Sequence, residues 1–146
     1  MAAPLEAIVV QLLTAIQAIA GYPVPAQLPE IAFVPHRYLE ERVCQRPCDV
    51  EGWFPPGTTI YLDEKLDPQN DLWARSILLH ELVHYVQQEE GAFFGKLNCD
   101  IWKEREREAY DVQIRWLASQ RASRRLLQRI SWPYLRITCQ EDDGKQ

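Results

Sequence analysis

The chain has 146 residues, a length that suits one domain spanning residues 1–146 and leaves little room for a second. Its composition, with 47% hydrophobic and 25% charged residues, excludes a largely disordered protein. The formal net charge of -5 argues against nucleic acid as a partner, because contacts with phosphates require a basic surface.

The first predicted element is a helix from Leu5 to Ala20. Apolar residues recur there at three- and four-residue steps, and Gly21 is expected to end the helix. The stretch has no basic residues before it and polar residues interrupt it, so it is not typical of a signal peptide. Because the chain has no run of about 18 apolar residues, we expect no membrane-spanning helix.

Short elements are predicted next. Residues 30–34 are expected to form a strand and residues 37–43 a helical turn. A loop rich in Pro, Gly and Cys should occupy residues 44–57. Residues 58–63, TTIYLD, are β-branched and aromatic, which predicts a second strand.

The strongest helical pattern of the chain comes after this strand. Asn70 or Asp71 can cap a helix that begins at Leu72, runs through RSILLHELVHYVQQEE and ends at Gly91. This helix is apolar on most sides, so we expect it in the middle of the domain.

The C-terminal third is predicted to be mainly helical, with helices at about residues 100–119 and 121–130, separate or continuous, and a short strand at 134–139. The last helix carries Arg121, Arg124, Arg125 and Arg129. Because these arginines alternate with apolar residues, they favour a solvated helix face over a site for an anionic partner. The expected fold class is α+β, mainly helical, with a small mixed or antiparallel sheet beside the central helix.

The four cysteines favour two disulfide bonds, with Cys44 paired to Cys48 and Cys99 to Cys139. Four buried thiols or a second metal site are the alternatives, although a structural zinc site more usually shows paired C-x2-C spacings. Disulfides would weakly favour an oxidising compartment, periplasmic or secreted.

The central helix contains His80-Glu81-Leu82-Val83-His84, an HExxH motif. Histidines four residues apart project from one helix face about one turn from each other, so both imidazoles can reach a single zinc ion. Glu81 can lean toward a zinc-bound water without binding the ion, as a general base does. The alternative is a pair of core histidines whose hydrogen bonds are satisfied within the protein.

A catalytic zinc site needs a third protein ligand, and no histidine follows the motif. A carboxylate from the helix WKEREREAYDVQIRWL is therefore expected, with Glu104, Glu106 and Glu108 as candidates. On a helical wheel Glu106 lies nearer the centre of the buried stripe than Glu108, and Glu104 points away. We predict Glu106, with Glu108 left open. The alternative is that these glutamates only pair with neighbouring arginines at the surface.

HELVHYVQQ, followed by EREAY in the next predicted helix, resembles the gluzincin zinc peptidases, which combine HExxH with a glutamate from a following helix. The resemblance covers about residues 58–115 and implies a reduced, thermolysin-like core with a zincin-like fold. It implies that the first glutamate of EREAY, Glu106, is the third ligand. It also implies hydrolysis of a peptide or protein substrate by zinc-activated water, with Glu81 as the base.

Tyr110 stands where larger gluzincins place an aspartate, so it is a candidate for hydrogen bonding to a ligand or for polarising the substrate carbonyl. A buried structural tyrosine is the alternative; Tyr85 and His36 are weaker candidates for stabilising an oxyanion. The resemblance further implies that backbone groups of residues 59–62 contact an extended substrate, unless that strand is interior.

Two other functions remain open. A non-catalytic, metal-stabilised binding or toxin-like module would use the same ligands without turnover. A deformylase-like amide hydrolase also carries HExxH but takes a cysteine ligand, for which only Cys44 and Cys48 offer any candidate.

Overall fold

The computed structural model describes residues 3–93 and 98–135, with side chains to residue 130. In chain order the elements are α1 (Leu5–Ala20), β1 (Glu30–Val34), α2 (His36–Leu39), a π-helical turn η1 (Glu40–Cys44), β2 (Gly52–Trp53), β3 (Thr59–Asp63), α3 (Leu72–Glu89), α4 (Cys99–Ser119) and α5 (Arg124–Leu135). The fold is therefore α+β and mainly helical, as predicted. No helix in the described part of the chain is long and apolar enough to cross a membrane.

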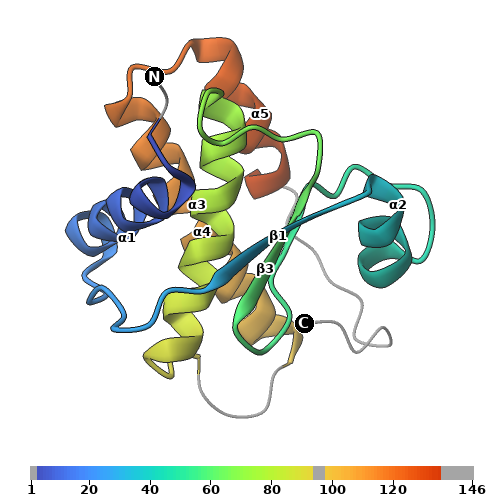
Figure 1. Ribbon diagram of the computed structural model, residues 1–146, viewed down its shortest axis with the longest axis horizontal. Helices are drawn as coiled ribbons and strands as arrows, with labels where there is room; N and C mark the ends of the chain where they lie inside the picture. Colours follow the sequence, from blue (N-terminus) through green and yellow to red (C-terminus); the bar gives the residue numbers. More distant parts are fainter. Residues whose placement is uncertain (1–2, 94–97, 136–146) are drawn as a thin grey trace.

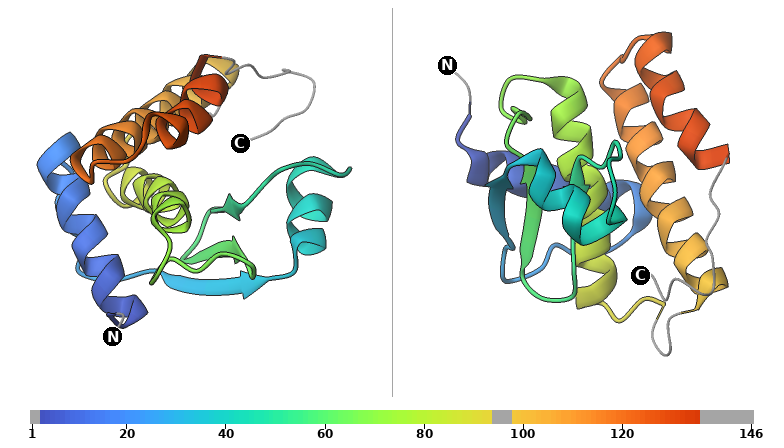
Figure 2. Two further views of the ribbon diagram at one scale, coloured as in Figure 1. Left: turned by 90° about the horizontal axis from the view of Figure 1, so that it is seen from above. Right: turned by 90° about the vertical axis from the view of Figure 1, so that its right-hand side faces the viewer.

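Helix α3 forms the centre of the domain. It packs against α1 and α4 and contacts strands β2 and β3 (Figure 1). The left-hand view of Figure 2 shows α3 between the α4–α5 pair and the sheet. Leu78, Leu79, Leu82 and Val83 follow one another closely on α3, and all four are fully buried. The prediction of a central helix that is apolar on most sides is confirmed.

The sheet is small and mixed. Strand β3 lies in the middle, parallel to β1 and antiparallel to β2. Ile60 and Leu62 of β3 are fully buried in the core, as alternation along a half-buried strand requires. Strand β3 has β1 along one side and β2 beside Tyr61 and Leu62 on the other, so the alternative considered for residues 59–62, an interior strand, is the one observed.

Local sequence signals set several helix ends. Helix α1 has the predicted bounds, and Gly21 ends it with φ 85°, a left-handed conformation that glycine adopts without strain. Asp71 caps α3, because its carboxylate accepts a hydrogen bond from the Ala74 backbone N–H at 2.8 Å.

Other element boundaries differ from the predictions. Strand β2 lies inside the segment predicted as a loop, and two residues are too few to give a periodic pattern. Helix α5 begins at Arg124, because Ser123 accepts a hydrogen bond from the Leu126 backbone N–H at its start. It continues through Leu135, so the strand predicted at 134–139 is wrong for its first two residues. Residues 136–139 lie outside the described part.

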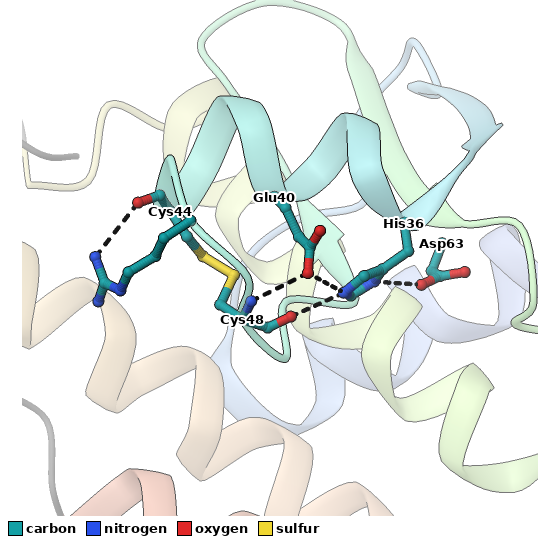
Figure 3. The surroundings of a disulfide bond; sticks show 6 residues. His36, Glu40, Cys44, Cys48 and Asp63 are labelled. Atoms are coloured by element: carbon teal, nitrogen blue, oxygen red, sulfur yellow. Dashed lines mark hydrogen bonds and ion pairs between the residues drawn. A yellow bond between two sulfur atoms is a disulfide. The ribbon is translucent and has the colours of Figure 1, made fainter.

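The predicted Cys44–Cys48 disulfide is present, with its Cα atoms 6.5 Å apart. His36 anchors the segment around it (Figure 3): its Nδ1 lies 2.8 Å from Asp63 Oδ2 on β3, and its Nε2 lies 2.8 Å from the Cys48 carbonyl oxygen. The predicted partner of Cys99, Cys139, lies outside the described residues. Thus α2 and the disulfide-closed turn are fixed to the sheet immediately before β2.

Candidate metal centre

Three predicted side chains meet between α3 and α4. His80 Nε2 lies 3.2 Å from Glu106 Oε1, and His84 Nε2 lies 2.9 Å from Glu106 Oε2. One ligand atom from each of the three residues falls within 4.8 Å of the others. Among the described residues this is the one group of at least three metal-binding side chains that is close enough to share an ion.

The packing of α4 determines which glutamate faces the histidines. Ala109 and Val112 are buried in the core, and Glu106 lies one helical turn before Ala109 on a neighbouring part of the helix surface. Glu104 is exposed and pairs with Arg107 at 3.0 Å, the surface pairing considered for all three glutamates. Glu108 instead accepts hydrogen bonds from Tyr22 and Gln87, so the structure places Glu106 at the cluster and Glu108 beside it.

Gln87 orients the His84 ring. The Gln87 Nε2 group donates to Glu108 Oε1 at 2.9 Å and to the Arg105 carbonyl oxygen at 3.2 Å. Both partners are acceptors, so the Gln87 amide has one orientation, with its oxygen 2.8 Å from His84 Nδ1. His84 Nδ1 must therefore carry the hydrogen and donate it.

Gln113 orients the His80 ring in the same way. The Ser76 hydroxyl donates to the Trp73 carbonyl oxygen at 2.8 Å, so Ser76 Oγ accepts from Gln113 Nε2 at 3.0 Å. The Gln113 amide oxygen then faces His80 Nδ1 at 2.9 Å and accepts its hydrogen. Each histidine thus directs Nε2 toward Glu106.

This hydrogen-bond pattern turns Nε2 of both rings toward the Glu106 carboxylate. A neutral ring with its hydrogen on Nδ1 presents a lone pair there, whereas a protonated ring donates a hydrogen to the carboxylate. His84 Nε2 is buried and makes no hydrogen bond of acceptable geometry despite the nearby Glu106 oxygen. Burial alone would raise the pKa of Glu106, but the imidazoles outweigh it and hold the pKa well below its usual value. The three groups are arranged so that they could hold a divalent cation, which would balance the carboxylate charge.

Glu81 lies beside this cluster without belonging to it. Its side chain is buried, and burial together with the charge of Glu106 raises its pKa to about 7, against the opposing charges of His80 and Arg105. Gly52 of β2 gives it room, since a Cβ there would lie 3.0 Å from Glu81 Cγ. The missing side chain therefore brings the strand backbone close to the Glu81 carboxyl.

A cavity of about 720 Å³ opens over the cluster. Residues 49–54 line it on one side and residues from α3, α4 and α5 on the others. Tyr110 is on its wall, with its ring centroid 4.5 Å from that of His80. Burial and the charges of Glu106 and Glu81 raise the pKa of Tyr110, so its hydroxyl stays protonated. The other two oxyanion candidates are elsewhere: Tyr85 donates to the Gln27 carbonyl, and His36 binds Asp63.

Several residues of the site were not predicted from the sequence. Gln87 and Gln113 hold the imidazoles, and Arg105 and Arg129 line the cavity, a position that the sequence did not indicate for either arginine. Gln87 lies three residues after His84, and helical spacing could have indicated it. The other residues contact side chains of separate helices, so no pattern within a single helix could have indicated them.

The fold and the cluster define an α+β domain with an HExxH helix and a carboxylate from the following helix. A family model described as a domain of unknown function, DUF6647, matches residues 1–144, and the chain belongs to this family. No curated protein and no solved structure matches the chain.

Proposed function

We propose that the protein is a zinc-dependent peptidase with a gluzincin-like centre, in which His80, His84 and Glu106 hold the ion. The observation that carries this proposal is the convergence of two Nε2 atoms on one carboxylate, with both Nδ1 atoms already bonded to amide oxygens. Two imidazoles and one carboxylate form a typical ligand set for catalytic zinc. A structural site closed by four ligands would need one more donor, and the described cluster has three.

Bound zinc would polarise the substrate carbonyl and make a water molecule more acidic. Glu81 accepts the proton of the attacking water and passes it to the leaving amine nitrogen. The Tyr110 hydroxyl, on the cavity wall beside the His80 ring, donates a hydrogen bond to the substrate carbonyl oxygen as negative charge develops there.

The edge strand β2 is the element best suited to hold an extended peptide. In the described sheet β2 pairs with β3 on one side only, which leaves its other edge free. Gly52 and Trp53 line the cavity, and Gly52 lies against Glu81. A substrate that pairs with this edge would pass directly over the reacting groups.

The deformylase-like alternative loses its ligand candidates. Cys44 and Cys48 are joined in a disulfide, and within the described residues no cysteine belongs to the metal cluster.

Metal loading tests the proposal directly. The chelated, metal-free protein should bind one zinc ion per chain, and zinc at 1,000 times its Kd should stabilise the fold by about 4 kcal/mol. Zinc should also restore hydrolysis of a mixed library of internally quenched peptides, which a chelator abolishes. Metal content, thermal unfolding and fluorescence are the measurements, with Mg²⁺ as the control ion. Zinc binding without any hydrolysis would identify a metal-stabilised binding module, and failure to bind zinc would end both interpretations.

Gln113 offers a separate test of how the centre is built. Replacing Gln113 with Leu keeps the volume similar and leaves the Ser76 hydroxyl bonded to the Trp73 carbonyl, but it removes the acceptor for His80 Nδ1. Zinc affinity should fall by about 10- to 100-fold, since the ring is no longer held in the binding tautomer. Competition with a zinc chelator measures the change, and unchanged affinity would refute the assigned role.

A further inference from the structure

Two arginines on the cavity wall form no ion pair with a carboxylate in the described part of the chain. Arg105 of α4 and Arg129 of α5 both line the cavity. Within the described residues neither guanidinium makes an ion pair or a hydrogen bond, whereas Arg107 and Arg115 at the surface of α4 pair with acidic neighbours on that helix. Guanidinium groups that line a cavity and have unused N–H donors are suited to bind a negatively charged ligand.

Arg129 is held in place by an aromatic ring. Its Cζ lies 3.8 Å from the centroid of the Trp73 ring, and the Trp73 Nε1–H donates to Glu51 Oε1 at 3.1 Å. The indole is thereby fixed at its edge while its face carries the cation. A ring face accepts no conventional hydrogen bond, so this contact leaves the N–H groups of Arg129 unused, and among the described residues no acceptor binds them.

Helix α5 is basic in an acidic protein, while the carboxylates of the cavity wall come from other segments, at Asp49, Glu51, Glu81 and Glu106. Helix α5, RRLLQRISWPYL, has three arginines and no acidic residue, while the whole chain has a net charge of -5. Arg124 and Arg125 are exposed and outside the cavity wall, as expected for a solvated helix face. Arg129 is exposed as well, but it also lines the cavity. The nearby acid Glu51 is bonded to Trp73 and makes no ion pair with Arg129.

The distance between Arg129 and the metal cluster follows from α3, because Arg129 lies on the ring of Trp73 and Trp73 is on the same helix as His80. Trp73 precedes His80 by seven residues on α3, which corresponds to about 10 Å along the helix axis. An extended peptide advances about 3.3 Å per residue. A chain that follows the cavity along α3 would therefore bring a side chain to Arg129 about three residues from the bond over the metal centre.

We propose that Arg129, seated on Trp73, forms a subsite for a carboxylate of the substrate, so that the cavity prefers peptides with an acidic residue about three positions from the cleaved bond. This inference rests on the proposed peptidase function and adds the substrate class to it. The same contact would suit the C-terminal carboxylate of a peptide. Peptides with a free and with an amidated C-terminus distinguish this group from a side-chain carboxylate.

The test uses the zinc-loaded full chain and a quenched peptide that it cleaves. Glu, Gln or Lys is placed in turn at each of four positions on both sides of the cleaved bond, with a free or amidated C-terminus. We expect kcat/KM for the Glu peptide to exceed that for the Gln peptide by about tenfold when the substituted position lies about three residues from the cleaved bond. This preference should be the same with a free and with an amidated C-terminus. Arg129→Glu should remove this preference and favour Lys over Gln at the same position. A preference that depends on the free C-terminus would overturn the side-chain subsite.

Arg125→Glu is the matched control, because it makes the same change in charge on the same helix outside the cavity wall. It should leave the ranking of the peptides unchanged. Arg129→Gln provides a second variant if the charge reversal lowers the unfolding temperature. An Arg129 variant that folds and ranks the peptides as the wild type does would overturn the subsite and leave the peptidase proposal standing.

Binding separates the two proposals if no peptide is cleaved. Fluorescence anisotropy of the same peptides on zinc-loaded Glu81→Gln protein should show about tenfold tighter binding of the Glu peptide, lost in the double variant with Arg129→Glu. If wild type cleaves nothing but this preference persists, the peptidase function fails and the carboxylate subsite holds. Equal binding of the Glu and Gln peptides would overturn the subsite.

Discussion

Replacing Glu81 with Gln should lower kcat by about 100- to 10,000-fold and leave zinc binding essentially intact. Gln has nearly the same shape as Glu but cannot accept the proton of the attacking water. The metal cluster of His80, His84 and Glu106 does not include Glu81, so its three ligands remain. Steady-state hydrolysis of a cleaved peptide, together with metal analysis of the same sample, measures both parts of the prediction.

The control for this variant is Glu104→Gln. Glu104 is exposed at the surface of α4, where it pairs with Arg107, and the same chemical change there should leave kcat unaltered. Full activity in the Glu81→Gln protein would show that another group acts as the base.

Glu106→Ala should weaken zinc binding by at least about a thousandfold, well beyond the 10- to 100-fold change typical of an outer hydrogen-bond partner. The substitution removes one of three ligands and leaves two imidazoles with no negative charge between them. Isothermal titration with zinc, or competition with a chelator where binding is tight, measures the loss. Activity should fall in parallel at limiting zinc.

Glu108→Ala is the matched control, two residues away on the same helix and also partly buried. Glu108 reaches the centre only through Gln87, whose Nε2 donates to it, so zinc affinity should change by no more than about 100-fold. A larger loss in Glu108→Ala than in Glu106→Ala would mean that the third ligand has been assigned to the wrong glutamate.

Helical periodicity accounts for most of what the sequence predicted. The spacing of His80 and His84 within an apolar run placed both histidines on one face of a central helix, and α3 has this form. The helical wheel favoured Glu106 over Glu108 because the buried stripe of α4 runs through Ala109 and Val112. In each case one helix contains the whole pattern, so its geometry can be calculated without knowing its neighbours.

The unpredicted features all depend on contacts between elements distant in sequence. Strand β2 is recognisable only by its pairing with β3. Gln113 acquires its role because α4 packs beside α3 and brings its amide to His80. Arg129 is exposed, as expected for a solvated face, but the alternation of α5 gives no indication that its guanidinium stacks on Trp73 at a cavity wall.

By itself the sequence determined the helix that carries the candidate metal ligands His80 and His84, the residue types of the cluster and the Cys44–Cys48 pairing, because each follows from short-range spacing along the chain. Only the tertiary structure decided the tautomers of the two imidazoles, the approach of Gly52 to Glu81 and the position of Arg129 over Trp73. The physical reason is that hydrogen-bond direction and close packing arise where separate elements meet, and local spacing contains no information about those distances.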